Sequence, residues 1–106
     1  MTVICINDQF PPDYRKFYKI HGVVTPYLDA IYTIRDVVHT RWGVGLHLEE
    51  LKNPLVPLFG EGEDAMKAEP NWNISRFANL DKSVLSKEQL YEFSRAVKAN
   101  PQVETI

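Results

Sequence analysis

The clearest pattern along the chain is an alternation of apolar and polar residues between positions 44 and 48. Every second side chain there is apolar, namely Val44, Leu46 and Leu48. A period of two is typical of a strand that buries one face. The β-branched segment 31–40 precedes this strand, and Gly43 lies between the two segments, where glycine adopts positive φ without strain. We therefore predict a β-hairpin whose loop consists of residues 41–43.

The length of this loop also predicts how the two strands pair. A loop of residues 41–43 places Thr40 opposite Val44, so that Val38 faces Leu46 across the hairpin. The same register turns Asp36 toward the core, which conflicts with its charge. We expect a β-bulge or an inward hydrogen bond to resolve this conflict.

Helices are predicted on both sides of the hairpin. Residues 11–22 begin with two prolines, carry aromatic residues at three- and four-residue spacing and end at Gly22, a pattern that favours a short helix. Further along, Ser86 and Gln89 form a capping box, and the helix that follows is expected over residues 86–99. Its apolar stripe consists of Leu90, Phe93, Ala96 and Val97. We expect this stripe to pack on the sheet.

The other segments complete a small α+β fold. Residues 2–7, "TVICIN", have the composition of an inner strand with both faces covered. Residues 53–70 contain three prolines and no sustained period, which predicts a long loop. Residues 71–77, "NWNISRF", predict a last strand that runs into a tight helical turn. We expect one domain over residues 1–106: a bent antiparallel sheet of four or five strands, closed or nearly closed as a barrel over about residues 2–81.

Composition and charge narrow the classes of function. The chain has 106 residues, 44% of them hydrophobic and 25% charged, as in an ordinary globular domain with one core. The net charge of −2 provides no general positive field for nucleic acid or an anionic membrane. Cys5 is the only cysteine, and the first residues contain neither a basic leader nor a long apolar stretch. We expect a cytoplasmic protein.

The reactive side chains near the hairpin do not form a recognisable catalytic or metal site. His39 and His47 are expected several residues apart on the outer face, whereas zinc ligands converge within about 2 Å of one ion. Glu49 and Glu50 are neighbours along a strand and point to opposite faces. No nucleophile, phosphate-binding or metalloprotease motif is present. The sequence therefore predicts a non-enzymatic protein without catalytic residues, metal or cofactor.

Two loops carry more aromatic and apolar surface than a solvated loop needs. Trp42 lies at the hairpin tip, where a large aromatic side chain packs on its own domain or on a partner, and Arg41 beside it can pair with an acidic group. The loop at 53–70 adds Leu58 and Phe59 next to an acidic run that begins at Glu61. These side chains either plug an open end of the barrel or dock a partner with a basic rim. We interpret the five residues as a binding surface for a protein.

Two alternatives use other segments. In "YRKFYK", residues 14–19, the cations Arg15, Lys16 and Lys19 are interleaved with aromatic residues, a composition that can hold single-stranded nucleic acid by stacking and charge. An ordinary amphipathic helix shows the same composition. The stripe on the C-terminal helix provides the second alternative, because it could pair with its own copy in a homo-oligomer.

Three segments resemble a set of small proteins encoded by phages and prophages. They are "VICIND" at 3–8, "YTIRDVVHTRWGVGLHLEELKNP" at 32–54 and "EPNWNISRFANL" at 69–80. The resemblance covers about residues 2–81 and implies a compact Src-homology-3-like barrel. The likeness also implies a phage or mobile-element origin, so we expect the protein-binding surface to act on a host or phage protein in the host cytoplasm. It supplies no activity and no functional residue, and the loop at 53–70 and the helix at 86–99 are additions to the shorter members.

Overall fold

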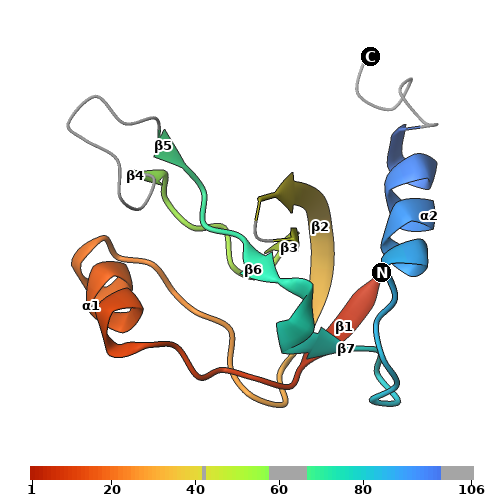
Figure 1. The fold of residues 1–106 in the computed structure, drawn as a ribbon, viewed down its shortest axis with the longest axis horizontal. Coiled ribbons are helices and arrows are strands. Elements are labelled where there is room, and N and C mark those ends of the chain that lie inside the picture. Colours follow the sequence, from red (N-terminus) through yellow and green to blue (C-terminus); the bar gives the residue numbers. More distant parts are fainter. Residues whose placement is uncertain (42, 58–66, 99–106) are drawn as a thin grey trace.

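An antiparallel sheet of five strands is the centre of the fold (Figure 1). The computed structural model describes residues 1–41, 43–57 and 67–98. In spatial order the strands are β6 (Trp72–Asn73), β3 (Gly43–Leu48), β2 (Ile31–Thr40), β1 (Thr2–Cys5) and β7 (Phe77–Ala78). A separate pair consists of β4 (Val56–Pro57) and β5 (Lys67–Ala68), and the helical elements are α1 (Pro12–Ile20), the 3₁₀ turn η1 (Ile74–Arg76) and α2 (Lys87–Lys98).

The sheet is bent but does not close into a barrel. Its edge strands β6 and β7 follow one another in the chain and are separated only by η1. Each of them pairs with a different neighbour, β6 with β3 and β7 with β1. A closed barrel needs a ladder between its edges, and these two-residue strands end at the turn that joins them. The predicted small α+β fold with an antiparallel sheet is confirmed, whereas full closure is wrong.

The hairpin of β2 and β3 is present, but its register differs by one residue from the prediction. Thr40 pairs with Gly43, so the loop has two residues instead of three. As a result Val37, and not Val38, lies opposite Leu46. Gly43, the first residue of β3, has a φ of +119°, a conformation that glycine adopts without strain.

The predicted β-bulge near Asp36 is confirmed. The pairing shifts between Ile34, which lies opposite Leu48, and Asp36, which lies opposite His47. Ile34 is buried, while 63% of the Asp36 side chain is exposed. The predicted inward position of Asp36 is therefore wrong, because the bulge and the one-residue shift turn its charge to solvent.

The core lies on the inner face of the sheet, between the two helices. Its buried side chains include Val3, Cys5, Tyr32, Ile34, Leu46, Leu48, Trp72, Phe77, Leu85 and Leu90. On the α1 side, the rings of Phe10, Tyr18 and Trp72 meet edge to face with centroids 5.5–5.7 Å apart. On the other side, α2 contributes Leu90, which is 1% exposed.

The sequence signals at Gly22 and Ser86 mark the end of α1 and the start of α2. After α1, Gly22 adopts a φ of +70° and the Val23 amide donates to the Tyr18 carbonyl at 2.9 Å, which closes the helix end. Before α2, the Gln89 amide donates to Ser86 Oγ and the Ser86 amide donates to Gln89 Oε1, both at 3.1 Å. The predicted capping box is therefore confirmed.

The first two residues of the apolar stripe of α2 are covered, and the side chain of Val97 lies outside the described part of the chain. Leu90 is buried and Phe93 is half-buried, but Ala96 is exposed. The predicted packing on the sheet holds for the first two turns, where α2 lies against β2.

β1 is an inner strand, as predicted, but only one of its faces is covered. Val3 and Cys5 point into the core and have no exposed surface. On the other face Thr2 is exposed and Ile4 is half-buried. The expectation of two covered faces is wrong, because both helices pack on the inner face of the sheet.

The segment 53–70 contains more structure than the predicted loop. β4 pairs with β5, and Val56 is buried although Leu55 is 65% exposed. The predicted last strand with its helical turn is confirmed by β6 and η1, where Asn73 Oδ1 accepts from the Ser75 amide at 2.9 Å. β7 follows directly after η1 and was not predicted.

Candidate binding groove

Most residues that the sequence nominates for protein binding lie outside the described part of the chain. This applies to Trp42, Leu58, Phe59 and Glu61. Only Arg41 can be placed, and it is exposed directly after β2. The described residues form a different concave surface close to this end of the hairpin.

A groove of about 380 Å³ lies between α2 and the β2–β3 hairpin. The hairpin contributes Val37, His39 and Val44, and α2 contributes Lys87, Leu90, Tyr91, Ser94 and Arg95. We call this surface the α2 groove. Its volume falls in the lower part of the range of about 300–1,000 Å³ that is typical of ligand pockets. The groove comes close to the hairpin loop, because His39 and Val44 form the second pair from it.

The observed strand register creates the α2 groove. His39 pairs with Val44, and Val37 lies two residues before His39 on the same side of β2, so these three side chains face α2. The predicted register had put Val38 on this side and His39 on the outer face. The α2 residues recur at spacings of three and four, which places them on one side of the helix.

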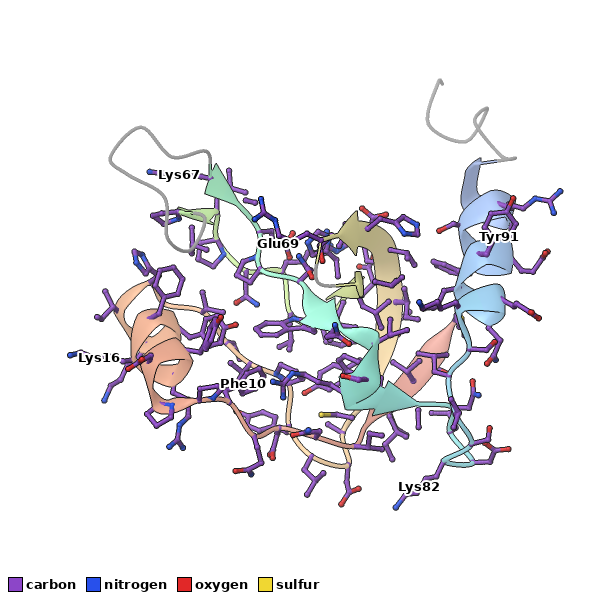
Figure 2. The ribbon with its side chains drawn as sticks, viewed as in Figure 1. Phe10, Lys16, Lys67, Glu69, Lys82 and Tyr91 are labelled. Carbon is purple, nitrogen blue, oxygen red and sulfur yellow. The ribbon has the colours of Figure 1, made fainter. Side chains whose placement is uncertain are left out.

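The floor of the α2 groove is apolar and its rim is basic. Leu90 is buried, and Val37 and Val44 are half-buried. The rim of the groove consists of Tyr91, which is 62% exposed, and of two exposed cations, Lys87 and Arg95. Figure 2 shows Tyr91 on the outer side of α2.

The charge of Arg95 is only weakly engaged within the protein. Its Nη1 lies 3.6 Å from Glu92 Oε1, in a pair whose side chains are 64% and 70% exposed. Its guanidinium also lies 5.7 Å from the centre of the Tyr91 ring. Exposed pairs of this kind contribute only about 0–1 kcal/mol, so Arg95 can exchange Glu92 for a carboxylate of a partner.

A second polar cluster lies on the opposite side of the hairpin, around Glu69. Its carboxylate accepts hydrogen bonds from the Arg35 side chain and from the Asn53 amide, the latter at 3.2 Å. His47 Nε2 lies 3.3 Å from the Glu69 carbonyl oxygen, and His47 Nδ1 lies 3.8 Å from Asp36 Oδ2. Glu69 directly follows β5 and lies close to the hairpin (Figure 2).

The pKa of Glu69 reflects these contacts. Burial alone would raise the pKa, but the hydrogen bonds from Arg35 and Asn53, with the charges of His47 and Arg35, outweigh burial and hold the pKa below its ordinary value. The carboxylate is thus ionised and fully engaged with the protein. This arrangement fixes the segment before β6 onto the hairpin.

The two histidines do not share a site. His39 faces α2, whereas His47 is on the Glu69 side of the hairpin. Within residues 1–41, 43–57 and 67–98, no group of three or more His, Cys, Asp or Glu side chains is arranged to hold a metal ion.

The segment nominated for nucleic acid lies on α1. Arg15, Lys16 and Lys19 are exposed, and Lys16 points away from the sheet in Figure 2. The aromatic side chains of the motif are partly used for packing, since Tyr18 meets Trp72 at 5.5 Å and burial raises the pKa of Tyr18. Tyr14 keeps 40% of its surface exposed.

Sequence reasoning missed the α2 side of the groove and the Glu69 cluster. Lys87, Tyr91 and Arg95 follow one another at four-residue spacing, a signal that was present beside the apolar stripe. Glu69 had no such signal, because Arg35 lies 34 positions away.

No known protein family, curated protein or solved structure matches the chain. In the described part of the chain, neither helix has the length and apolar character needed to cross a membrane. The inference of function therefore depends on the geometry of the surface.

Proposed function

We propose that the protein is a non-enzymatic protein-binding module that holds an acidic and apolar segment of its partner in the α2 groove. One observation carries this proposal: an apolar floor and a cationic rim occur together in one concave surface. Apolar side chains of the partner would cover Val44 and Leu90. Carboxylates of the partner would pair with Lys87 and Arg95.

The composition of the rim supports a protein partner. Tyrosine and arginine are enriched among the residues that dominate binding energy in protein interfaces, and Tyr91 and Arg95 are adjacent on the rim. Arg41 adds a further cation at the nearby end of β2. Since the whole chain carries a net charge of −2, this local concentration of cations favours acidic partners at one place on the surface.

We further propose that the sheet is an open, divergent form of the Src-homology-3-like fold, of phage or prophage origin, and that the protein acts on a host or phage protein in the host cytoplasm. The support is that the three segments that carry the resemblance coincide with the strands of the main sheet: 3–8 with β1, 32–54 with β2 and β3, and 69–80 with β6 and β7. The resemblance does not extend to α2, so the groove would be specific to this protein.

Fluorescence anisotropy with two pools of short labelled peptides tests the proposed function. One pool combines acidic with apolar residues, and the other combines basic with the same apolar residues. We expect the acidic pool to bind, and the double variant Lys87→Glu/Arg95→Glu to weaken its binding by about tenfold or more, because both cations of the rim are reversed. The matched control Lys16→Glu/Lys19→Glu, with the same change of net charge on α1, should bind like the wild type.

Two results would contradict the proposal. Equal binding of the acidic and the basic pool would show that the cationic rim does not select the partner. Equal loss of binding in both double variants would show that only the net charge of the protein matters.

A second candidate function, binding of single-stranded nucleic acid on α1, is favoured by one observation. Arg15, Lys16 and Lys19 are exposed, and none of them has an ion pair within the described residues. A labelled oligonucleotide in the same assay separates the two functions. Binding to phosphates falls steeply as the salt concentration rises, and it would be lost in Lys16→Glu/Lys19→Glu but retained in the groove variant.

A further inference from the structure

The outer face of the main sheet carries a row of apolar residues that neither helix covers. The pairing of the strands aligns Ile31 of β2, Ile4 of β1 and Ala78 of β7, and an isolated bridge adds Val84 beside Ala78. Directly paired residues point to the same side of a sheet. The two ends of the row are open to solvent, with 58% of Ile31 and 85% of Val84 exposed, whereas Ile4 is half-buried and Ala78 is buried.

Neighbouring side chains extend this row into a patch. Ile6 lies two positions after Ile4, and its amide continues the pairing with the β7 side through the Arg76 carbonyl at 2.7 Å. Ile6 is 44% exposed, and Leu80, in the turn between Ala78 and Val84, is 50% exposed. We call this surface the outer apolar face, defined as Ile4, Ile6, Ile31, Leu80 and Val84. Exposed apolar side chains that gather on one face of a protein mark an interaction site.

Two charged residues of opposite sign lie next to the outer apolar face. Asp29 precedes Ile31, and Lys82 lies between Leu80 and Val84. Lys82 Nζ and Asp29 Oδ1 are 3.9 Å apart, and both side chains are 66% exposed. Figure 2 shows Lys82 reaching out from the turn before α2.

The backbone at these two positions is unusual. Asp29 has a φ of +67° and Lys82 a φ of +69°, and they are the only residues other than glycine with positive φ in the described ranges. Glycine or asparagine fits this conformation better than lysine does. Lysine at this strained position is consistent with a function for its charge.

We propose that the outer apolar face is the interface of a homodimer, in which the face packs against its own copy about a two-fold axis. A second copy presents the same isoleucine and valine surface, so the apolar parts match by symmetry. The rim carries one anion and one cation, and a two-fold rotation can bring Lys82 of each copy to Asp29 of the other. Charge complementarity thus favours a second copy over a partner with a strong net charge.

The sequence predicts a different contact for a homo-oligomer, namely the apolar stripe of α2. Leu90, the first residue of that stripe, is buried against the core. The outer apolar face lies on the other side of the sheet, so the contact proposed here leaves the α2 groove open. The dimer proposal does not depend on the proposed function.

Sedimentation velocity of the full chain over a range of concentrations tests the interface. We expect the wild type to dimerise, and Ile31→Lys/Val84→Lys to raise the dissociation constant of the dimer by at least about tenfold. Leu55→Lys is the matched control, because Leu55 is 65% exposed but lies outside the face. Thermal unfolding followed by circular dichroism verifies that each variant is folded. A wild type that is monomeric at all concentrations, or an equal loss in Leu55→Lys, would overturn the proposal.

A charge exchange tests the two-fold arrangement. Lys82→Glu alone and Asp29→Lys alone each place like charges across the axis, so each variant should dimerise more weakly than the wild type. In a heterodimer that forms when the two variants are mixed, residue 82 of each copy again faces a residue 29 of opposite charge. We therefore expect the heterodimer to form with the affinity of the wild-type dimer. Failure of the mixture to form heterodimers would overturn the pairing of Lys82 with Asp29 across the axis.

Discussion

Glu69 shows how one side chain can position segments that are distant in the sequence. It directly follows β5, yet its carboxylate accepts from Arg35 on β2 and from the Asn53 amide after β3. The Asn53 side chain in turn bonds to both backbone groups of Val24, at 2.8 and 3.0 Å. Glu69 thus joins three segments, and only 17% of its side chain is exposed.

Replacing this carboxylate should destabilise the protein. We expect Glu69→Gln to lower the free energy of unfolding by about 1–3 kcal/mol at neutral pH, because hydrogen bonds to charged groups contribute more than neutral ones. Urea denaturation measures the change. Glu49→Gln is the control: Glu49 pairs with Lys52 at 3.3 Å but is exposed, and its replacement should change stability by less than about 0.5 kcal/mol.

The lowered pKa of Glu69 also predicts a pH dependence. A carboxyl group whose folded pKa lies below its ordinary value of 4.5 stabilises the protein above that value. The contribution is lost as the pH falls through the folded pKa. The difference in stability between wild type and Glu69→Gln should therefore shrink in acid, and a difference that stays constant would show that the ionised carboxylate is not responsible.

Gly45 has a different role, because it makes room for a neighbouring side chain. A Cβ at this position would lie 1.9 Å from Asn71 Oδ1 and 3.2 Å from Asn71 Cβ. We expect Gly45→Ala to lower the free energy of unfolding by about 1–3 kcal/mol through overpacking. Adding Asn71→Ala should recover part of this loss, since only the 3.2 Å contact persists. No recovery in the double variant, measured by urea denaturation, would exclude Asn71 as the cause.

Among the elements, α2 is the one that local sequence signals define best. Its capping box and the two leucines around it, Leu85 and Leu90, were readable from spacing alone, and both leucines are buried. Gln89 also exchanges amide hydrogen bonds with Asn79, at 3.0 and 3.1 Å, which joins the helix to the turn after β7. Hydrogen bonds from Ser86 and from Asn79 therefore both fix the start of α2, which forms one wall of the α2 groove.

Removal of the helix cap should weaken this element. We expect Ser86→Ala to lower the free energy of unfolding by about 1 kcal/mol, because the Gln89 amide loses its acceptor. Ser75→Ala is the control, because it removes an exposed hydroxyl in η1, away from the start of α2. If thermal unfolding showed equal loss in both variants, the cap would not be the source of the effect.

The sequence predicted those elements whose signals are local. The hairpin, both helices and the bulge at Asp36 follow from periodicity, caps and charge. The register did not follow, because Gly43 can either end a loop of three residues or begin the strand after a loop of two. This difference of one residue decides whether Val37 or Val38 faces α2. The Glu69 cluster and the open sheet depend on contacts between distant segments, which no local pattern encodes.

At the scale of the whole molecule, the two proposed surfaces lie on opposite sides of the sheet. The α2 groove lies on the inner side, and the outer apolar face is on the other. A dimer through the outer apolar face would therefore carry two open grooves. Two linked sites bind a multivalent partner more tightly than one site does, without any new contact.

This arrangement predicts a difference between free and immobilised ligands. A single acidic and apolar peptide in solution should bind the wild type and Ile31→Lys/Val84→Lys with equal affinity. The same peptide at high density on a surface should retain the wild type about tenfold longer or more, because only the dimer binds twice. Surface plasmon resonance measures both, and equal retention would contradict a bivalent dimer.

The central claim is that the α2 groove is the binding site, and amide chemical-shift mapping tests it most directly. An isotope-labelled protein is titrated with the tightest-binding acidic and apolar peptide. We predict that the largest shifts fall on the residues of the groove: Val37, His39, Val44, Lys87, Leu90, Tyr91, Ser94 and Arg95. Shifts concentrated on α1 or on the outer apolar face, with none in the groove, would contradict the claim.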